Sequence, residues 1–344
     1  MIGAQLNVRR GPRCSTTTST SSAATPSPGR RRRACGSYAT RTATTRRRRG
    51  RVAAGPGAGR RRGTGSGKLG VRTHHNRTTI LLTSPVSRTT MDTAEFYGFG
   101  FANAVIREAL RPEDDVLVVT KVGADPNPGG RLPLRLPLRL AQRPEQLRAS
   151  VEGNLRSLGV DRLAVVNLRC LDTGPGLRPQ GNQVVDPDDQ LAVMTALRDE
   201  GKIGAIGLSS VTLDGLRRAL PAGVVCVQNA YSLVSREDED MLQLCAAEGI
   251  AWVPFFLLGG AFPGLPKATA EPAVHAVAES LGATPSPVGL AWLLHHAPNV
   301  LLIPGTANAT HLEANIAVSE IALDAAALAT LDGVESRSND VSIG

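Results

Sequence analysis

The sequence predicts an α/β fold, a (β/α)8 TIM barrel of parallel strands that starts near Met91. Its candidate strands are almost unbroken runs of Val, Ile, Leu and Ala, which is typical of a parallel sheet covered on both faces. Amphipathic, helix-like segments alternate with these runs, as expected for repeated βαβ units. Polar residues follow many different strands, and no GxGxxG motif follows an early one. This distribution favours a barrel, whose chemistry collects at the C-terminal ends of its strands, over a doubly wound sheet with one switch point.

The predicted elements follow Met91 in a regular order. We expect strands at residues 116–120, 163–168, 205–208, 224–228, 250–255 and 300–303. We expect helices at residues 103–110, 145–158, 187–199, 213–220, 238–248, 271–281, 286–295, 310–318 and 324–331. The second of these helices follows Pro144, a residue favoured at a helix start, and stops at Gly159, a residue favoured just past a helix end. Residues 124–143, rich in Pro, Gly and Arg, are predicted to form a surface loop.

Three residues that suit acid–base chemistry lie just past predicted strand ends. They are Asp92 and Tyr97 in the stretch MDTAEFYG, and Lys121 in VVTKVG. A buried lysine beside a tyrosine favours phenolate over phenol, and an aspartate keeps that lysine charged and in position. Taken singly, each has a structural explanation: Asp92 as a helix cap, Tyr97 as a core aromatic and Lys121 as a surface charge. Together, and with the pattern downstream, they indicate a tyrosine that can hand a proton to a carbonyl oxygen.

The distribution of charge divides the chain into two parts. Residues 1–90 hold 20 of the 39 Lys and Arg residues and no Asp or Glu. The 254 residues from 91 to 344 carry the other 19 basic residues and all 30 acidic ones, a net charge of −11, so the overall charge of +9 describes neither part. We predict a disordered tail rich in Arg, Ser, Thr and Gly at residues 1–90, and the barrel domain at residues 91–344.

Three interpretations of the predicted tail stay open. A cleaved transit peptide is usually rich in Arg and Ser and poor in acidic residues, as residues 1–90 are, although this segment is long for one. A nucleic-acid-binding arm agrees with the charge, but Tyr38 is the only Phe, Tyr or Trp in the segment, which leaves little to stack on bases. Arg, Gly, Ala, Pro and Thr are also what GC-rich codons encode out of frame. We favour an out-of-frame or wrongly assigned start, because patterned sequence begins so abruptly at Met91.

Cysteine spacing and hydropathy bear on metal binding and on location. The five cysteines are Cys14, Cys35, Cys170, Cys226 and Cys245. They form no CxxC pair and no metal-ligand spacing, so we predict no metal site. Their odd number, and the apolar runs around three of them, are typical of buried free thiols in a reducing compartment, and we predict a cytoplasmic protein. No apolar run reaches the roughly 18 residues of a membrane span, and the N-terminus lacks the apolar segment of a secretory signal.

From about Met91 to about Val334 the sequence resembles the aldo-keto reductase superfamily. The motifs that carry the resemblance are, in order, DTAEFYG, VVTKVG, LRASVEGNLRSLGVDRL, GKIGAIGLSS, VQNAYSL and IPGTANATHLEAN. VVNLR at residues 165–169, VPFFLLGG at residues 253–260 and the run GLAWLLHHAPNVLLIPGT are similar to the pyridoxal reductase (pyridoxine 4-dehydrogenase) branch. The resemblance implies an aldo-keto reductase barrel that reduces an aldehyde or ketone to an alcohol with NADP(H), with pyridoxal as the expected substrate.

Asp92, Tyr97 and Lys121 match three members of the family's catalytic tetrad. By this resemblance Tyr97 donates the proton to the carbonyl, Lys121 makes the phenol more acidic and Asp92 anchors Lys121. The fourth member is usually a histidine, and here Arg169 stands in its place. A guanidinium still donates hydrogen bonds to a developing oxyanion and stays charged. We therefore assign Arg169 to orienting the substrate, with Asn167 as the alternative.

The resemblance also implies a set of cofactor contacts. Polar residues at two strand ends match those that hold the nicotinamide carboxamide, with Ser-Ser in place of the usual Ser-Asn pair. Phe255 matches the aromatic residue that stacks on the nicotinamide ring, although it suits a core position equally well. Gly305 and His311 stand where the family commonly has basic residues for the NADP 2′-phosphate, but backbone amides at the start of the last helix still suit a phosphate. We expect NADP(H) in preference to NAD(H), held by Ser209, Ser210, Gln228, Asn229, Phe255, Gly305, Thr306, Asn308, His311 and Asn315.

The family's first strand, its first helix and most of its second strand precede the DTA motif, where this chain has the Arg-rich tail. We therefore expect a barrel that is incomplete at its N-terminus and exposes two sheet edges. The alternatives to an active enzyme are an inactive truncated homologue and a non-catalytic NADP(H)-binding regulatory subunit on the same fold. The expected partner is a small carbonyl substrate. No membrane is expected, a nucleic acid is disfavoured, and the sequence predicts no oligomeric state.

Overall fold

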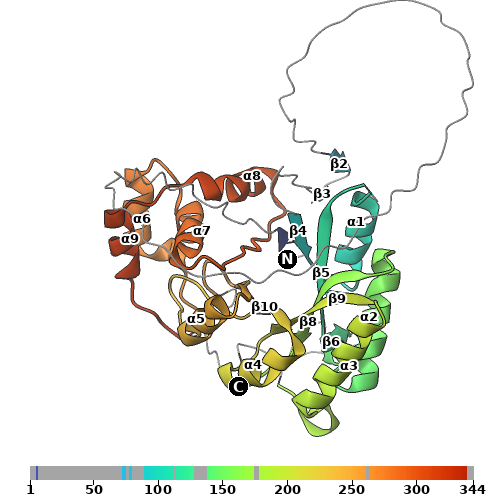
Figure 1. Cartoon of the computed structure of the whole chain (residues 1–344). Helices are drawn as coiled ribbons and strands as arrows, with labels where there is room; N and C mark the ends of the chain where they lie inside the picture. The colour runs from blue at the N-terminus through green and yellow to red at the C-terminus, as the bar shows by residue number, and fades with distance from the viewer. Residues whose placement is uncertain are drawn as a thin grey trace, which may run out of the picture. The chain divides into compact units, whose positions relative to one another are not determined.

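The computed structural model describes residues 5–6, 72–74, 77–79 and 89–338, apart from residues 112, 128–137, 174–177 and 261–263 (Figure 1). The predicted tail, residues 1–90, therefore lies outside the described residues except for its last two residues and three short strands. These strands are β1 (Gln5–Leu6), β2 (Arg72–His74) and β3 (Arg77–Thr79), and the last two pair with each other in antiparallel fashion.

Parallel strands form the centre of the described chain. Six of them lie side by side in chain order: β4 (Thr89–Asp92), β5 (Val116–Val122), β8 (Leu163–Arg169), β9 (Ile203–Ser209), β10 (Val224–Gln228) and β11 (Ala251–Trp252). At one edge Trp252 forms a parallel bridge to Val300, and at the other edge β4 pairs antiparallel with β1. Figure 1 shows helices α1 to α4 on the outer side of β5, β8 and β9. The parallel, curled sheet and its covering helices confirm the predicted fold class.

The helices alternate with the strands as the sequence predicts. They are α1 (Phe101–Ala109), α2 (Pro144–Leu158), α3 (Pro187–Asp199), α4 (Leu213–Ala219), α5 (Glu239–Ala247), α6 (Pro272–Ser280), α7 (Pro285–His296), α8 (Ala309–Ala317) and α9 (Ala325–Asp332), with 3-10 turns at Gly181–Gln183, Leu220–Ala222, Ala268–Ala270 and Val318–Glu320. Local signals define several ends. Asp186 caps α3 by accepting a hydrogen bond from Asp188 N (2.9 Å), and Asp324 caps α9 by accepting one from Ala327 N (2.8 Å). Gly159, with φ 70°, ends α2 in the left-handed conformation.

The predicted strand at residues 250–255 is shorter in the structure, where β11 covers Ala251–Trp252. Its pairing with the strand before it nevertheless continues, because Phe255 N still donates to Asn229 O (3.0 Å). The regular ladder breaks at Pro254, which has no backbone N–H to donate. The chain therefore stays extended beside β10 up to the point where its side chains face a cleft.

Two other predicted segments also differ from expectation. The strand predicted at residues 300–303 is represented by isolated bridging, in which Val300 pairs with Trp252 and Leu301 N donates to Trp252 O (2.8 Å). The surface loop predicted at residues 124–143 begins and ends in a short antiparallel hairpin. Its strands are β6 (Ala124–Pro126) and β7 (Leu138–Leu140), and residues 128–137 between them lie outside the described residues.

Most of the sheet is buried, as its uniform apolar composition predicts, although Val225 in β10 is 40 % exposed. In β9, Ile203, Ile206 and Leu208 are at most 1 % exposed, and in β8 Leu163 and Leu168 are equally covered. Truncating one such side chain to alanine typically costs about 2–5 kcal/mol of stability. This packing fixes the strands, and therefore the positions of the polar residues at their ends.

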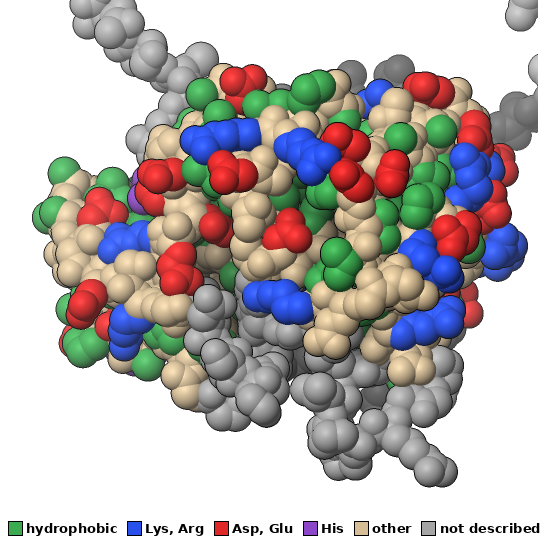
Figure 2. Space-filling view, turned by 90° about the horizontal axis from the view of Figure 1, so that it is seen from below, with side chains coloured by type: hydrophobic (Ala, Val, Ile, Leu, Met, Phe, Trp, Pro, Cys, Tyr) green, Lys and Arg blue, Asp and Glu red, His purple; other side chains and the backbone are tan. Residues whose placement is uncertain are grey.

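Charged side chains of both signs are interspersed on the face shown in Figure 2. Several exposed charges form ion pairs, such as Arg148 with Glu200 (2.6 Å) and Arg218 with Asp186 (2.6 Å). Exposed pairs of this kind contribute about 0–1 kcal/mol each. The face in view therefore offers no continuous basic surface to a nucleic acid backbone.

Two further findings bear on the predicted location. In the described part of the chain, Cys170, Cys226 and Cys245 are free thiols, and burial raises the pKa of Cys226 to about 12. No single described helix has the length and apolar composition needed to cross a membrane. One bent helix pair, residues 309–320 with 325–332, meets that test at an angle of 116°.

Gly123, at the end of β5, has no room for a side chain. Its backbone is left-handed (φ +99°), and a Cβ atom there would lie 2.7 Å from Arg169 O and 2.9 Å from Gln142 Nε2. We predict that Gly123→Ala lowers the free energy of unfolding by about 2–4 kcal/mol, because backbone strain and overpacking add. Gly201→Ala is the matched control, since Gly201 is also left-handed (φ +78°) but has nothing within 4 Å of its Cβ position; about 1 kcal/mol is expected there. Urea unfolding of both variants measures the difference, and equal losses would contradict the prediction.

Candidate active site

The predicted ion pair forms at the C-terminal ends of β4 and β5. These neighbouring strands are parallel, with Asp92 opposite Val119, so Lys121 lies two residues beyond that level on the adjacent strand. Lys121 Nζ donates hydrogen bonds to Asp92 Oδ1 and to Thr93 O (3.1 Å). Both charged side chains are buried, at 7 % and 3 % exposure. The structure thus brings together two of the three residues selected for acid–base chemistry.

The neighbours of Lys121 keep it charged. Burial alone lowers the pKa of this lysine, but the charges of Asp92 and Tyr97 and their hydrogen bonds to the ammonium act in the opposite direction and prevail. The pKa of Lys121 therefore lies above its ordinary value of 10.5. The side chain is an ammonium at neutral pH.

Tyr97, the third selected residue, lies against this ammonium. Lys121 Nζ is 5.1 Å from the centroid of the phenol ring. The ring stands edge to face with Phe96, with their centroids 5.1 Å apart. The loop that carries Tyr97 is tightly turned, and residues 98–100, a phenylalanine among them, all have left-handed backbones (φ 61°, 56° and 84°). A left-handed conformation costs a residue with a side chain about 1–2 kcal/mol, so other contacts must hold this loop.

A largely buried polar network, which no local sequence pattern indicates, supplies those contacts. Glu95 Oε2 accepts hydrogen bonds from Asn103 Nδ2 (2.5 Å) and from Ser157 Oγ (2.6 Å). Asn103 Nδ2 also donates to Asn154 Oδ1 (3.2 Å), which accepts a second hydrogen bond from Thr120 Oγ1 (2.7 Å). The network therefore ties the tyrosine loop to helices α1 and α2 and to strand β5.

Arg169, at the end of β8, directs its side chain toward the aromatic residues of the tyrosine loop. Its Cζ lies 5.5 Å from the centroid of the Phe96 ring. Burial lowers the pKa of Arg169, and the charge of Tyr97 opposes that change. The alternative, Asn167, is fully buried: its Oδ1 accepts from Cys226 Sγ (3.2 Å), whereas its Nδ2 has no partner among the residues described.

The residues selected for the nicotinamide amide lie at the ends of β9 and β10. Ser209 and Ser210 are buried, and Ser210 has a left-handed backbone (φ 53°). Gln228 has a role that the sequence did not predict, because its Nε2 donates to Asp92 Oδ2 (2.7 Å) and so holds the second oxygen of the acid that binds Lys121. Its Oε1 is buried and without a partner in the described part of the chain. This open acceptor fits the N–H of a carboxamide such as that of nicotinamide.

Asn229, selected with the same group, is engaged within the protein instead. Its Oδ1 accepts from Val211 N (3.1 Å), and its Nδ2 donates to Val211 O (2.8 Å) and to Asp238 Oδ2 (2.8 Å). These bonds use both N–H groups of the amide and one lone pair of its oxygen, and the residue is fully buried. Asn229 therefore braces the turn after β9.

A cleft of about 360 Å³ lies between residues 255–259 and the start of α8. Five residues selected for cofactor binding line it: Phe255, Gly305, Thr306, His311 and Asn315. Asn308 has a different task, because its Oδ1 caps α8 by accepting from Thr310 N (2.9 Å) and His311 N (3.3 Å). The cap engages two of the backbone amides at the start of α8 that were expected to suit a phosphate.

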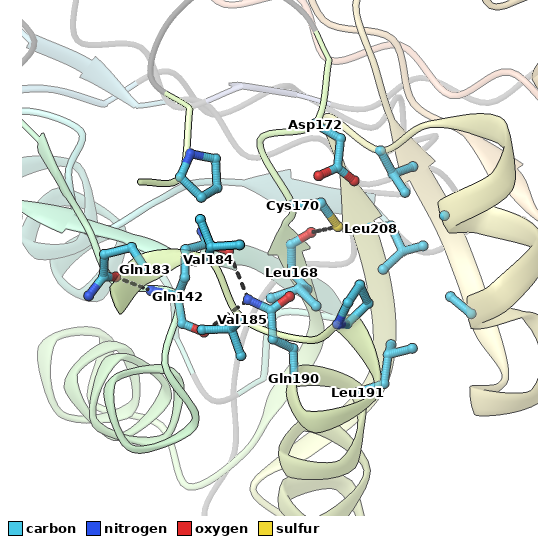
Figure 3. A pocket seen from close by; sticks show the side chains of 15 residues that line it. Gln142, Leu168, Cys170, Asp172, Gln183, Val184, Val185, Gln190, Leu191 and Leu208 are labelled. Atoms are coloured by element: carbon cyan, nitrogen blue, oxygen red, sulfur yellow. Dashed lines mark hydrogen bonds between the residues drawn. The ribbon is translucent and has the colours of Figure 1, made fainter. Parts of the chain in front are cut away.

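A smaller pocket of about 120 Å³ is shown in Figure 3. Its lining includes Leu168 and Cys170 but not Arg169 between them, as expected where successive strand residues face opposite sides. The pocket therefore lies across β8 from the lysine and tyrosine, and burial raises the pKa of the Cys170 thiol, which keeps it unreactive. Within the described ranges, no three His, Cys, Asp or Glu side chains are grouped as a metal site.

A family match adds to this geometry. The sequence profile of the Aldo/keto reductase family matches residues 85–336, the larger part of the chain. A parallel barrel sheet with a buried Asp–Lys pair and a tyrosine at its C-terminal edge agrees with that match. The chain belongs to the aldo/keto reductase family, a class of oxidoreductases that act on small carbonyl substrates.

Three similar proteins indicate which members of the family this chain resembles. Pyridoxine 4-dehydrogenase of Escherichia coli (strain K12) is 44% identical over 246 residues, which cover 71% of this chain and 81% of that protein. An uncharacterized oxidoreductase of Schizosaccharomyces pombe is 33% identical over 261 residues, covering 73% and 75%. The crystal structure of an aldo-keto reductase from Klebsiella pneumoniae in complex with NADPH is 27% identical, with a TM-score of 0.56 over 71% of this chain and 78% of that one. The first of these confirms the predicted resemblance to the pyridoxine 4-dehydrogenase branch.

We predict that Asp92→Asn lowers the free energy of unfolding by about 3–5 kcal/mol, because it leaves the buried ammonium of Lys121 without a countercharge. Removing both charges in Asp92→Asn/Lys121→Met should recover most of that loss. Urea denaturation of the wild type, both single variants and the double variant gives the coupling energy. Losses that simply add would contradict a coupled buried pair.

The raised pKa of Lys121 predicts how stability depends on pH. A group whose folded pKa exceeds its unfolded pKa contributes stability that is fully present below the unfolded value and is lost as pH rises through the folded one. Relative to Asp92→Asn/Lys121→Met, the wild type should therefore lose stability only above pH 10.5, with a slope of up to about 1.4 kcal/mol per pH unit. Thermal melts at alkaline pH measure this, and a difference that changes near neutral pH instead would contradict it.

Proposed function

We propose that this chain reduces the aldehyde of pyridoxal to the alcohol of pyridoxine, with NADPH as the hydride donor. The observation that carries the proposal is the position of the Lys121 ammonium, hydrogen-bonded to Asp92 and packed against the Tyr97 ring at the C-terminal edge of a parallel sheet. Pyridoxal as the substrate is supported by the 44% identity with the Escherichia coli pyridoxine 4-dehydrogenase.

Tyr97 is the proton donor in this mechanism. As negative charge develops on the carbonyl oxygen, the neighbouring ammonium of Lys121 favours transfer of the phenol proton to that oxygen. Asp92 keeps Lys121 charged and in place, and Gln228 fixes the second oxygen of Asp92 (2.7 Å). The carbonyl carbon gains a hydride, its oxygen gains the phenol proton, and the tyrosinate left behind takes a proton from solvent.

The nicotinamide end of the cofactor is assigned to the ends of β9, β10 and β11. The unpaired Oε1 of Gln228 would accept from the carboxamide N–H₂, the hydroxyls of Ser209 and Ser210 would bind the same group, and Phe255 would cover the ring. NADPH supplies the hydride when bound. The orphaned acceptor of Gln228 supports this assignment, because a buried carbonyl oxygen without a partner is costly unless a ligand satisfies it.

The adenosine end is assigned to the part of the 360 Å³ cleft at the start of α8, whereas Phe255 lines the part assigned to the nicotinamide. Thr306, Asn315 and His311 offer hydrogen-bonding side chains there. Similar structures were solved in complex with NADPH and with NADP, which supports NADP(H) over NAD(H). Because Gly305 and His311 supply no permanent positive charge to the 2′-phosphate, we expect the preference to be modest.

Full-length protein should oxidise NADPH in the presence of pyridoxal, and Tyr97→Phe should lower kcat by about 10²- to 10⁴-fold. The phenylalanine keeps the edge-to-face packing on Phe96 and removes only the hydroxyl. NADPH binding, followed by fluorescence titration, is the control and should stay within a factor of about two. Full turnover by Tyr97→Phe would refute the assignment of Tyr97.

A second candidate is a non-catalytic NADP(H)-binding subunit or an inactive homologue on the same fold. The observation that favours it is the edge of β4, the strand that carries Asp92, which pairs antiparallel with the two residues of β1 instead of with a parallel strand. Such a protein would bind NADPH tightly and turn over aldehydes slowly. The same assay separates the two candidates, because binding without pyridoxal-dependent oxidation supports the second.

The limits of the domain and the location of the protein remain predictions. We propose residues 91–344 as the barrel domain, supported by a family match that begins at residue 85. We propose a cytoplasmic location, supported by the free thiols of Cys170, Cys226 and Cys245. A nucleic-acid partner for residues 1–90 stays disfavoured; affinity that falls steeply with salt, and is lost on deletion of these residues, would reverse that view.

A further inference from the structure

Arg169 is a cation whose countercharge is missing from the described chain. Its guanidinium lies over the ring of Phe96, and the charge of Tyr97 acts on its pKa. Among the described residues, no carboxylate forms an ion pair with it. The acid closest to the chemistry, Asp92, already accepts hydrogen bonds from Lys121 on one oxygen and from Gln228 on the other. The site thus holds two cations and one fully engaged anion.

Such an arrangement is unfavourable unless something completes it. A charge taken partly out of water loses solvation, and proteins normally restore that loss with a partner of opposite sign. Here burial opposes the charged form of Arg169 and lowers its pKa. The missing partner is therefore expected on a molecule that enters the site.

Hydrogen bonds and strand pairing hold the backbone of Arg169 in position. Its carbonyl oxygen accepts from Gln142 Nε2 (3.0 Å), and Gln142 Oε1 in turn accepts from Gln190 Nε2 (2.8 Å); Figure 3 shows these two glutamines in contact. The strand also pairs Arg169 with Ser209. The guanidinium lies over the Phe96 ring, with its Cζ 5.5 Å from the ring centroid, and its planar set of N–H donors suits an anionic oxygen.

We infer that Arg169 determines substrate specificity. It selects carbonyl substrates that carry an anionic oxygen close to the reacting carbonyl group. The form that fits best is an aromatic ortho-hydroxyaldehyde bound as its phenolate. Tyr97 receives the aldehyde oxygen, and the edge of the Arg169 guanidinium receives the phenolate. The inference rests on the proposed function, because pyridoxal has a hydroxyl ortho to its aldehyde. The carboxylate of a 2-oxo acid has the same chemistry and is distinguished in the test.

The kinetic test compares salicylaldehyde with 3-hydroxybenzaldehyde, which differ only in the position of the hydroxyl. In the wild type, kcat/KM should be about 10- to 100-fold higher for salicylaldehyde, the range expected for one hydrogen bond between charged groups. The ratio should rise with pH through the phenol's own pKa. Arg169→Gln should reduce the ratio to near one, and Arg169→Lys should keep part of it. General damage to the fold lowers both rates and leaves their ratio unchanged.

A binding measurement provides a readout that does not depend on turnover. Salicylamide and benzamide cannot be reduced and differ in the same ortho hydroxyl. Calorimetry on the NADP-loaded protein, above the pKa of the phenol, should show salicylamide binding about 10-fold or more tightly, with the difference lost in Arg169→Gln. Phenylglyoxylate, a 2-oxo acid, is assayed in parallel, and a preference for it over salicylaldehyde would overturn the phenolate assignment.

The outcomes separate this inference from the proposed function. If pyridoxal is reduced but the ortho preference is absent, or survives in Arg169→Gln, the inference fails and the proposed function stands. If pyridoxal is not reduced but salicylamide is preferred through Arg169, the inference stands and the proposed substrate fails. Loss of both pyridoxal reduction and the ortho preference contradicts both the proposed function and the inference.

Discussion

The buried ammonium of Lys121 imposes the requirement that most of the site satisfies. An amine this deep loses its charge unless a carboxylate stands beside it, and Asp92 reaches it only because β4 and β5 run parallel with their ends level. Gln228, from the far side of the barrel sheet, then holds the free oxygen of Asp92. Hydrogen bonds around the Lys121 charge thus link strands β4, β5 and β10. The phenol of Tyr97 gains its chemical environment from the same arrangement.

The loop that carries Tyr97 depends on a second polar cluster. Its strained backbone is held by Glu95, whose carboxylate accepts from α1 and α2 through Asn103 and Ser157. Because the cluster also reaches β5 through Asn154, a displacement of either helix would alter the distance between the phenol and the ammonium. Fold stability and the geometry of proton transfer are therefore linked through buried hydrogen bonds, which are expensive to leave unsatisfied.

Much of the fold is predictable from the sequence, because buried strands appear locally as runs of Val, Ile, Leu and Ala. It also indicated Asp92, Tyr97 and Lys121, since their types and spacing suit one reaction. The partners of side-chain amides were not predictable in the same way. Gln228 and Asn229 are adjacent, yet one holds Asp92, 136 residues away, and the other braces Val211. Such choices depend on tertiary contacts that no local pattern records. Asn308 likewise was selected for a cofactor and is a helix cap.

The charge state of Lys121 is the most direct test of this account. Selective ¹⁵N labelling of lysine and NMR detection of the Lys121 Nζ resonance, assigned through Lys121→Met, report that state without any assay of turnover. The account predicts an ammonium signal that stays constant from neutral pH to beyond pH 10.5 and that changes in Asp92→Asn. A resonance characteristic of a neutral amine near neutral pH would contradict it.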